Sequence, residues 1–372
     1  MRIVIVGGGV LGTMHAWHAV RRGHQVLHLE RELEARAASV RNFGLVWVSG
    51  RANGVELDTA LRARHLWAEI GAEVPGVGFR ANGSLTVLRT DAELAVAAQT
   101  AARDDSVRRG FTLLSADKAR ALNPALRGEF LGALHCQLDG AVESRVVMPA
   151  LRAALESTGR YRWLPGREAR AVDHAAVRDD HGELHAGDLV LLCPGANLSG
   201  LVRELVSDLP LRRVRLQMMQ TEPLGERLTT SVADGDSLRY YPAFQGSALA
   251  ELLAGQPQEP IAAEHRMQLL MVQRLDGGLT IGDTHSYTEP FPFDLHDDPY
   301  RHLAGVAEAL LGRPLPKVAR RWAGVYCERT DTGHVALRQQ VADGVVLITG
   351  PGGRGMTCSP AIAEATAEEL DL

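Results

Sequence analysis

The sequence lacks any apolar run long enough to cross a membrane, for which roughly 20 consecutive apolar residues are needed. Cysteine is also scarce: there are four, none in a CxxC pair, so neither a disulfide framework nor a zinc site is expected. The formal net charge of -5 gives no reason to expect nucleic acid as a partner. The N-terminus passes from a short apolar run directly into glycines, without the longer apolar stretch of a signal peptide. We therefore expect a cytoplasmic protein with no membrane span and no bound metal.

What is present has the composition of a globular enzyme. The chain has 372 residues, of which 45% are hydrophobic and 23% are charged. This length exceeds that of one ordinary core, so two domains or one large α/β unit are expected. Either arrangement can enclose a large ligand.

The first thirty residues have the pattern of a βαβ unit. A β-branched run, Arg2 to Val6, predicts a buried parallel strand, and a second strand ends at Glu30. Between them lies Gly7-x-Gly9-x-x-Gly12. The first glycine permits the tight turn, the second lets the backbone approach a pyrophosphate, and the third lets helix pack on strand. Glu30 has the place of an acid that accepts the ribose hydroxyls, so the unit predicts dinucleotide binding.

A second unit of strand, glycine loop and helix, "GVVLITGPGGRGMTCSPAIAEATAEEL", closes the chain. The N-terminal motif alone does not separate NAD from FAD. Glycine loops at both ends favour FAD, because its adenosine and its flavin need different cradles. Gly350, Gly352, Gly353 and Gly355 would let the chain pass close to a flat ring, and the helix start would stabilise negative charge on the reduced flavin.

The middle of the chain differs in character from its ends. Alternation over residues 169–186 predicts a β-meander, and residues 91–110 predict one helix. From Val214 onward, segments such as "SLRYYPAF" predict antiparallel strands. We expect a discontinuous FAD-binding domain of residues 1–85, 140–212 and 320–372, and a substrate-binding domain of residues 86–139 and 213–319.

Several motifs, in order, resemble the flavoprotein family of D-amino acid oxidase, glycine oxidase and monomeric sarcosine oxidase. They are "IVIVGGGVLG", "LER", "ASVRNFGLV", "GALHCQLDGAVESRVVMPAL", "LVLLCPGAN", "RRWAGVYCERTD" and "GPGGRGM". The resemblance implies an α/β fold: a Rossmann-like FAD-binding domain of the D-amino acid oxidase and glutathione reductase type, plus an antiparallel β-sheet substrate domain with helices.

The resemblance also implies the residues that contact FAD. With the glycine motifs, they are Gly7, Gly9, Val10, Leu11, Gly12, Glu30, Arg31, Ala38, Ser39, Phe43, Gly44, Leu45, Val172, Gly195, Gly350, Pro351, Gly352, Gly353, Arg354, Gly355 and Met356. The flavin performs the redox step, so no catalytic residue beyond it is required.

Closer still is the resemblance to a subgroup found with enzymes of aminophosphonate degradation, through "SVRNFGLVWVSGR" and "LRYYPAF". It implies oxidation of the C–N bond of a small anionic amine, such as N-methyl-2-aminoethylphosphonate, to an aldehyde and an amine. Two alternatives stay open: an oxidase or dehydrogenase of sarcosine, glycine or another N-methyl amino acid, and a non-catalytic FAD-binding redox subunit. Oxygen, a quinone and a partner protein are all open as electron acceptor, and the oligomeric state is open.

The amino-acid branch of the family commonly places an arginine in Trp-x-Gly-x-Arg-Pro-x-Thr to hold the substrate carboxylate. Here the corresponding segment runs from Trp322 to Thr330 and is one residue longer. Counted back from Thr330, Cys327 takes the arginine's place, so this bidentate clamp is absent from the sequence. A different anion site is implied. The candidates for substrate contact are Arg239, Tyr240, Tyr241, His285, Cys327, Arg329 and Arg354.

Cys327 itself has three interpretations. It lines the pocket where the arginine is missing, it is a structural thiol, or it bonds covalently to FAD, as a cysteine does in the sarcosine-oxidising branch. Neighbouring Arg329 would favour the thiolate that attachment needs, whereas Glu328 opposes it.

Overall fold

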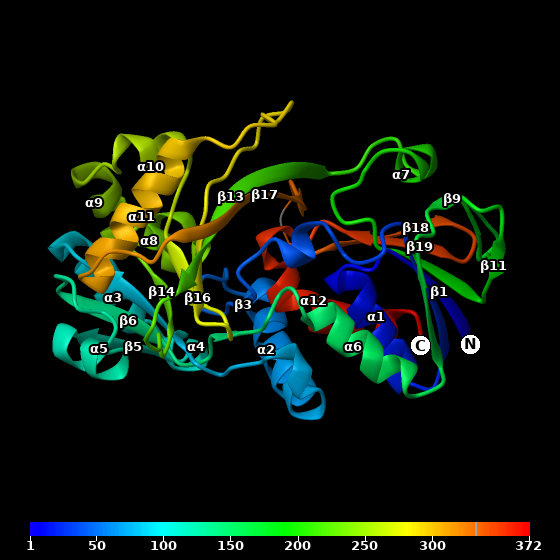
Figure 1. Cartoon of the computed structure of the whole chain (residues 1–372), viewed down its shortest axis with the longest axis horizontal. Coiled ribbons are helices and arrows are strands. Elements are labelled where there is room, and N and C mark those ends of the chain that lie inside the picture. Colours follow the sequence, from blue (N-terminus) through cyan, green and yellow to red (C-terminus); the bar gives the residue numbers. More distant parts are fainter. Residues whose placement is uncertain (332) are drawn as a thin grey trace.

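The computed structural model describes residues 1–331 and 333–372, in which two large sheets dominate (Figure 1). The first sheet has six strands in the order β18-β19-β12-β1-β2-β8. Their bounds are β1 Arg2–Val6, β2 Gln25–Glu30, β8 Tyr161–Pro165, β12 Leu189–Leu192, β18 Leu337–Ala342 and β19 Val345–Thr349. All neighbours pair in parallel except β18 and β19. The N- and C-terminal strands therefore share one sheet, as their similar motifs predict, and both termini lie at the same end of the molecule.

Helices cover one face of this sheet and a small sheet covers the other. On the helical face α1 packs against α6 and α12, and α12 also packs against α2. These helices are α1 Val10–Arg21, α2 Val55–Glu73, α6 Val147–Glu156 and α12 Gly355–Glu369. They enclose a core that includes Ile3, Met14 and Trp67. The small sheet is the predicted β-meander, with β9 Ala169–Asp173, β10 Ala176–Asp179 and β11 Leu184–Ala186.

One side-chain cluster stabilises the β10–β11 hairpin. Asp179, fully buried, accepts bonds from Arg167 at 2.8 Å and from His185 at 2.9 Å. Asp179, Glu183 and His185 also have the spacing of a metal site. Because Arg167 already supplies the cation, we interpret the group as a structural ion-pair network.

The second sheet has eight strands in the order β17-β13-β16-β15-β14-β4-β6-β5. Their bounds are β4 Ser84–Leu88, β5 Phe111–Ser115, β6 Gly132–Cys136, β13 Leu211–Pro223, β14 Ser231–Ala233, β15 Leu270–Gln273, β16 Gly278–Gly282 and β17 Val318–Arg329. All neighbours are antiparallel except β14 and β4. β17 pairs along β13 and so lies in this sheet, although the expected boundary at residue 320 puts most of it with the FAD-binding domain.

The remaining elements are short apart from α11, which packs on the second sheet. They are α3 Asp91–Ala101, α4 Ser106–Arg109, α5 Ala116–Leu122, α7 Leu201–Leu205, α8 Ser237–Tyr240, α9 Ser247–Gly255, α10 Pro260–Glu264, α11 Asp297–Leu311, β3 Leu45–Val46 and β7 Gly140–Ala141, with 3-10 turns η1 Ala38–Val40, η2 Pro75–Val77, η3 Pro242–Phe244 and η4 Gly352–Arg354. Within the described ranges, no helix is long and apolar enough to cross a membrane.

Two sequence predictions about elements are wrong. The segment "SLRYYPAF" forms α8 and η3 instead of a strand, because Pro242 fixes a helical turn where a strand would need a backbone donor. The helix predicted over residues 91–110 divides into α3 and α4, since the chain turns between them and Arg103 pairs there with Asp105 at 3.0 Å.

Candidate functional site

The helix α1 begins at the glycine loop with its backbone donors directed at a cavity. Gly9 precedes the helix, and the N–H of Val10 donates to Oγ of Ser39 at 2.9 Å. The first turn of α1 contains no acidic residue. Such a helix start is an anion site, because free N–H groups and the helix dipole both favour negative charge.

Glu30 lies at the end of β2, beside this loop. Its carboxylate accepts from the N–H of Gly8 at 2.6 Å and from the N–H of Glu32 at 3.0 Å. A cavity of about 530 Å³ opens here and is lined by Gly7, Gly9, Glu30, Arg31, Ala38, Ser39 and Gly195, among others. This is where we expect the adenosine and pyrophosphate of FAD.

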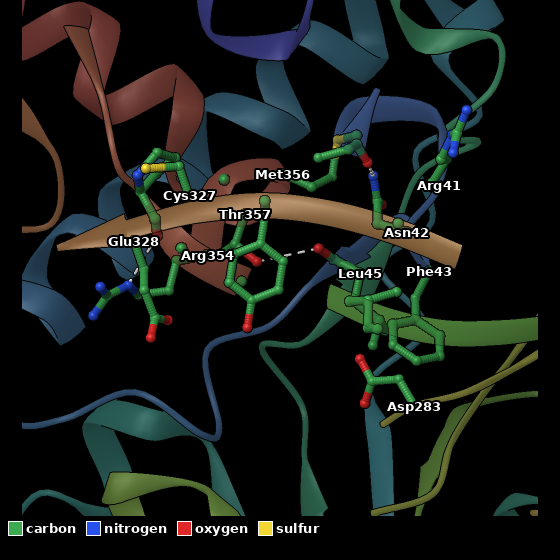
Figure 2. A pocket seen from close by; sticks show the side chains of 18 of the residues that line it. Arg41, Asn42, Phe43, Leu45, Asp283, Cys327, Glu328, Arg354, Met356 and Thr357 are labelled. Carbon is green, nitrogen blue, oxygen red and sulfur yellow. Dashed lines mark hydrogen bonds between the residues drawn. The ribbon is translucent and has the colours of Figure 1, made fainter. Parts of the chain in front are cut away.

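A second cavity of about 390 Å³ adjoins the first, and Gly9, Ser39 and Gly195 line both. It extends to the C-terminal glycine loop and to the second sheet (Figure 2). Its lining includes several of the residues expected to contact FAD: Val10, Leu11, Ala38, Phe43, Leu45 and residues 351–356. Two joined cavities, each at a helix start, fit a long dinucleotide.

The C-terminal loop brings backbone close to the cavity. A Cβ built on Gly353 would have Oη of Tyr326 as its nearest neighbour, at 3.8 Å, so that this side of the loop faces open space. The helix α12 begins at Gly355 and points its N-terminus at the same space. These observations fit a flat ring lying against the loop.

Four of the residues expected to contact FAD line neither cavity: Gly12, Gly44, Val172 and Gly350. A Cβ on Gly12 would meet the carbonyl of Gly7 at 2.0 Å, and one on Gly44 would meet the carbonyl of Val142 at 2.1 Å. Gly350 packs against Leu211. Their positions indicate close backbone packing rather than direct contact. Val172 pairs with Val177 in the meander and lies outside both linings.

The end of the cavity that adjoins the second sheet is aromatic. Tyr240 stacks on His285 with ring centroids 4.4 Å apart, and Tyr241 meets Tyr240 edge-on at 5.0 Å. Tyr287 and Tyr326 also line this end. The structure thus brings together Tyr240, Tyr241, His285, Cys327 and Arg354 of the expected substrate contacts.

Two expected substrate contacts require correction, because the guanidinium groups of Arg239 and Arg329 point elsewhere. Arg239 pairs with Asp236 at 3.0 Å and donates to the carbonyl of Gln256. Arg329 pairs with Asp331 and donates toward the carbonyl of Ala336. Both lie outside the cavity lining.

The cavity has a cationic group that sequence reasoning missed. Arg51 is 6% exposed and lies 3.6 Å from Glu56, which also binds Arg354 at 2.8 Å. Nε1 of Trp47, a donor, is buried and finds no partner among the described residues. Trp47 and Arg51 lie in "SVRNFGLVWVSGR", a segment whose resemblance to relatives is the only signal that the sequence offers for them.

Cys327 lines the cavity and is 3% exposed. Burial, and then the neighbouring Glu328 carboxylate, raise the pKa of its thiol to about 12, while Arg213 opposes the shift. Arg329, expected to favour the thiolate, is instead paired with Asp331. The thiol is therefore protonated at neutral pH in this structure.

We accordingly expect FAD to be bound without a covalent link to Cys327. Attachment requires a thiolate, which a pKa of about 12 disfavours. Precipitation of the yellow protein with acid should leave the flavin absorbance in the supernatant. Flavin that stays in the pellet, and is lost from it in Cys327→Ser, would contradict this expectation.

Comparisons with known proteins agree with the geometry. The sequence model of the family described as DAO, FAD dependent oxidoreductase, matches residues 2–369. The B component of opine oxidase from Rhizobium meliloti is 28% identical over 247 residues, 59% of this chain and 63% of that protein. The mitochondrial pyruvate dehydrogenase phosphatase regulatory subunit of Mus musculus is 26% identical over 284 residues, 72% of this chain and 32% of that protein. The chain thus spans less than two thirds of the length of these relatives.

Solved structures of low sequence identity share the fold. Glycine oxidase from Geobacillus kaustophilus superimposes with a TM-score of 0.78 at 17% identity, over 100% of this chain and 95% of that one. Iminodiacetate oxidase from Chelativorans sp. BNC1 superimposes with a TM-score of 0.75 at 17% identity, over 100% of this chain and 95% of that one. The predictions of the fold class, of FAD as cofactor and of an oxidoreductase are confirmed. The chain therefore belongs to the DAO family of FAD-dependent oxidoreductases.

Proposed function

We propose that the chain oxidises the C–N bond of a small amine bearing an anionic group, with an (N-methyl) aminoalkylphosphonate such as N-methyl-2-aminoethylphosphonate as substrate. The main support is the charge in the lining of the second cavity. Two guanidinium groups, of Arg51 and Arg354, share the single carboxylate of Glu56. Within this group of three side chains, one positive charge is left over. The same lining includes Nε1 of Trp47, which has no hydrogen-bond partner among the described residues.

The missing arginine supports a phosphonate over a carboxylate. A planar guanidinium at the position of Cys327 would match a planar carboxylate with two parallel bonds, which a thiol cannot do. Arg51 and Arg354 come from separate segments of the chain and approach one carboxylate from two directions. Donors spread in this way suit the three oxygens of a tetrahedral phosphonate.

Bound FAD would accept the hydride equivalent from the carbon next to nitrogen, and water would then hydrolyse the resulting imine. The protein's own residues orient the substrate. Arg51 and Arg354 hold its anion, and Tyr240, Tyr241 and Tyr287 enclose its carbon chain and exclude water. The names of the structural neighbours glycine oxidase and iminodiacetate oxidase support amine substrates, and leave a sarcosine-like or glycine-like compound as the alternative.

A panel of amines mixed with the yellow protein without oxygen tests the proposal. N-methyl-2-aminoethylphosphonate should bleach the flavin at a lower concentration than sarcosine or glycine. In Arg51→Met the half-saturating concentration should rise about 10- to 100-fold, because a charge-assisted hydrogen bond contributes about 1.5–3 kcal/mol. Arg329→Met, which removes a guanidinium outside the lining, should leave it unchanged.

Three results would contradict the proposal. Bleaching by sarcosine at a lower concentration than by N-methyl-2-aminoethylphosphonate would favour the amino acid alternative. A flavin that light reduces but that no amine bleaches would favour a non-catalytic subunit. Equal half-saturation in Arg51→Met and the wild type would contradict the anion site.

A further inference from the structure

Three hydrogen-bond acceptors meet at the cavity wall, and we name them the acceptor corner: Oδ2 of Asp283, Oε1 of Gln268 and Nε2 of His285. All three side chains line the cavity and are at most 5% exposed. Asp283 and His285 follow β16, and Gln268 precedes β15, so the antiparallel pairing of these strands brings them together. Figure 2 shows Asp283 among the lining side chains, with Phe43 and Leu45.

His285 acts as an acceptor toward the cavity. Its Nδ1 lies 3.0 Å from the carbonyl oxygen of Arg266, so Nδ1 holds the hydrogen and donates it there. Burial lowers the pKa of the ring to about 4, so it is neutral at physiological pH. Its Nε2 therefore presents a lone pair.

Gln268 presents a second acceptor. Its amide Nε2 donates to Oδ1 of Asp283 at 3.1 Å. Its Oε1 is buried and finds no hydrogen-bond partner in the part of the chain that the structure describes. A buried polar atom without a hydrogen-bond partner lowers the stability of the fold by about 1–3 kcal/mol. An unpartnered acceptor in a cavity wall therefore indicates that a ligand supplies the donor.

Asp283 presents the third acceptor without a cation to balance it. Over residues 1–331 and 333–372, the one basic nitrogen within 4.0 Å of its carboxyl is Nε2 of His285, at 3.8 Å, which bears no hydrogen. A carboxyl buried in this way is costly unless it is paired or neutral. Within the described residues, the corner thus lacks a cation, and Oε1 of Gln268 lacks a hydrogen-bond donor.

We infer that the acceptor corner binds the protonated amine of the substrate through its N–H groups. This rests on the proposed function and adds the second half of the site: Arg51 and Arg354 take the anion and the corner takes the ammonium. A methylated secondary ammonium brings two N–H donors and one charge, which are what the corner lacks. A quaternary ammonium brings the charge without a donor.

The corner also accounts for the uncharged amine that oxidation requires. One proton moves from the ammonium nitrogen to Oδ2 of Asp283, which leaves a neutral amine with its lone pair and a neutral carboxyl. Total charge is conserved, and no other reactant is needed. Burial raises the pKa of the Asp283 carboxyl, which favours this direction of transfer.

Calorimetry without oxygen on FAD-loaded protein, with 2-aminoethylphosphonate and ethylphosphonate as probes, tests the inference. The wild type should bind 2-aminoethylphosphonate at least about tenfold more tightly than ethylphosphonate, which lacks the amine. Asp283→Asn keeps the shape and the acceptor for Gln268 but loses the charge. It should lose this gain while binding ethylphosphonate as before. Gln268→Leu should lose part of the gain.

Asp234→Asn is the matched control, because Asp234 is a buried carboxyl that accepts from the N–H of Leu269 and lies outside the cavity lining. It should keep the full gain. A gain retained in Asp283→Asn, or absent from the wild type, would overturn the inference. If neither phosphonate binds, the proposed substrate fails and the same comparison with sarcosine and acetate tests the corner independently.

Discussion

Replacing Gly9 with valine is expected to give a folded protein without yellow colour. Gly9 has φ −71°, which any residue adopts, and a Cβ there would meet only the side chain of Ser39, whose Oγ lies 3.0 Å away and would have to move slightly. The protein itself therefore tolerates a side chain at this position. Valine just before the helix costs about 1 kcal/mol as a poor cap. Its methyl groups would project into the space where we expect the pyrophosphate, and a loss of about 3 kcal/mol would weaken FAD binding over a hundredfold.

The ratio of flavin to protein absorbance after purification measures this loss, and thermal unfolding of FAD-free protein measures folding. Gly305→Val is the matched control, since Gly305 is exposed on α11 with open space around its Cβ. It should purify yellow. A yellow Gly9→Val protein would place the pyrophosphate elsewhere. Gly7 is less informative, because its φ of +106° and a Cβ 2.2 Å from the carbonyl of Cys193 would disturb the fold itself.

Much of the FAD-binding half could be predicted because its signals are local. A buried strand, a glycine turn and a helix follow one another within about thirty residues, and each glycine has a steric reason visible in the sequence pattern. The same pattern at residues 345–369 predicted that both ends share a sheet, which β19 and α12 confirm.

The substrate end could not be predicted in the same way because short-range geometry decides which side chains face the cavity. Arg239 adjoins Tyr240, but α8 turns it back to Asp236, three residues earlier, while the tyrosine faces the cavity. Arg329 is held by Asp331, two residues later. A neighbouring carboxylate pairs with each guanidinium and leaves it unavailable to a substrate.

The acceptor corner depends on long-range pairing. Gln268 and Asp283 are 15 residues apart and meet only because Leu270 of β15 pairs with Gly282 of β16. Neither residue type signals a ligand alone. What distinguishes them is the combination of burial, unmet acceptors and absent cation, none of which is visible without the fold.

The protein is expected to unfold steeply in mild acid, between about pH 6.5 and pH 4. His15 and His18 lie buried on α1, and His28 lies buried on β2. Burial is the largest cause that lowers their pKa values from the ordinary 6.5 to about 3, 4 and 4. Because the folded pKa is depressed, the unfolded chain binds protons first as pH falls. The stability is therefore intact above pH 6.5 and is lost toward the folded pKa values.

At pH 5 each of these histidines should lower the free energy of unfolding by about 2 kcal/mol. Three such losses are comparable with the whole stability of many proteins, about 5–15 kcal/mol. Urea unfolding at pH 7.5 and pH 5.0 measures the difference. In His15→Gln, the side chain can still reach Oγ1 of Thr366, and the loss of unfolding free energy between pH 7.5 and pH 5.0 should shrink by the contribution of one histidine. The control His65→Gln, on the exposed side of α2, should leave this loss unchanged. Since His28 lies 2.9 Å from the carbonyl oxygen of Gly7, in the loop where FAD is expected, flavin fluorescence should rise over the same pH range. Parallel pH profiles for His15→Gln and the wild type would show that acid acts elsewhere, on the carboxylates.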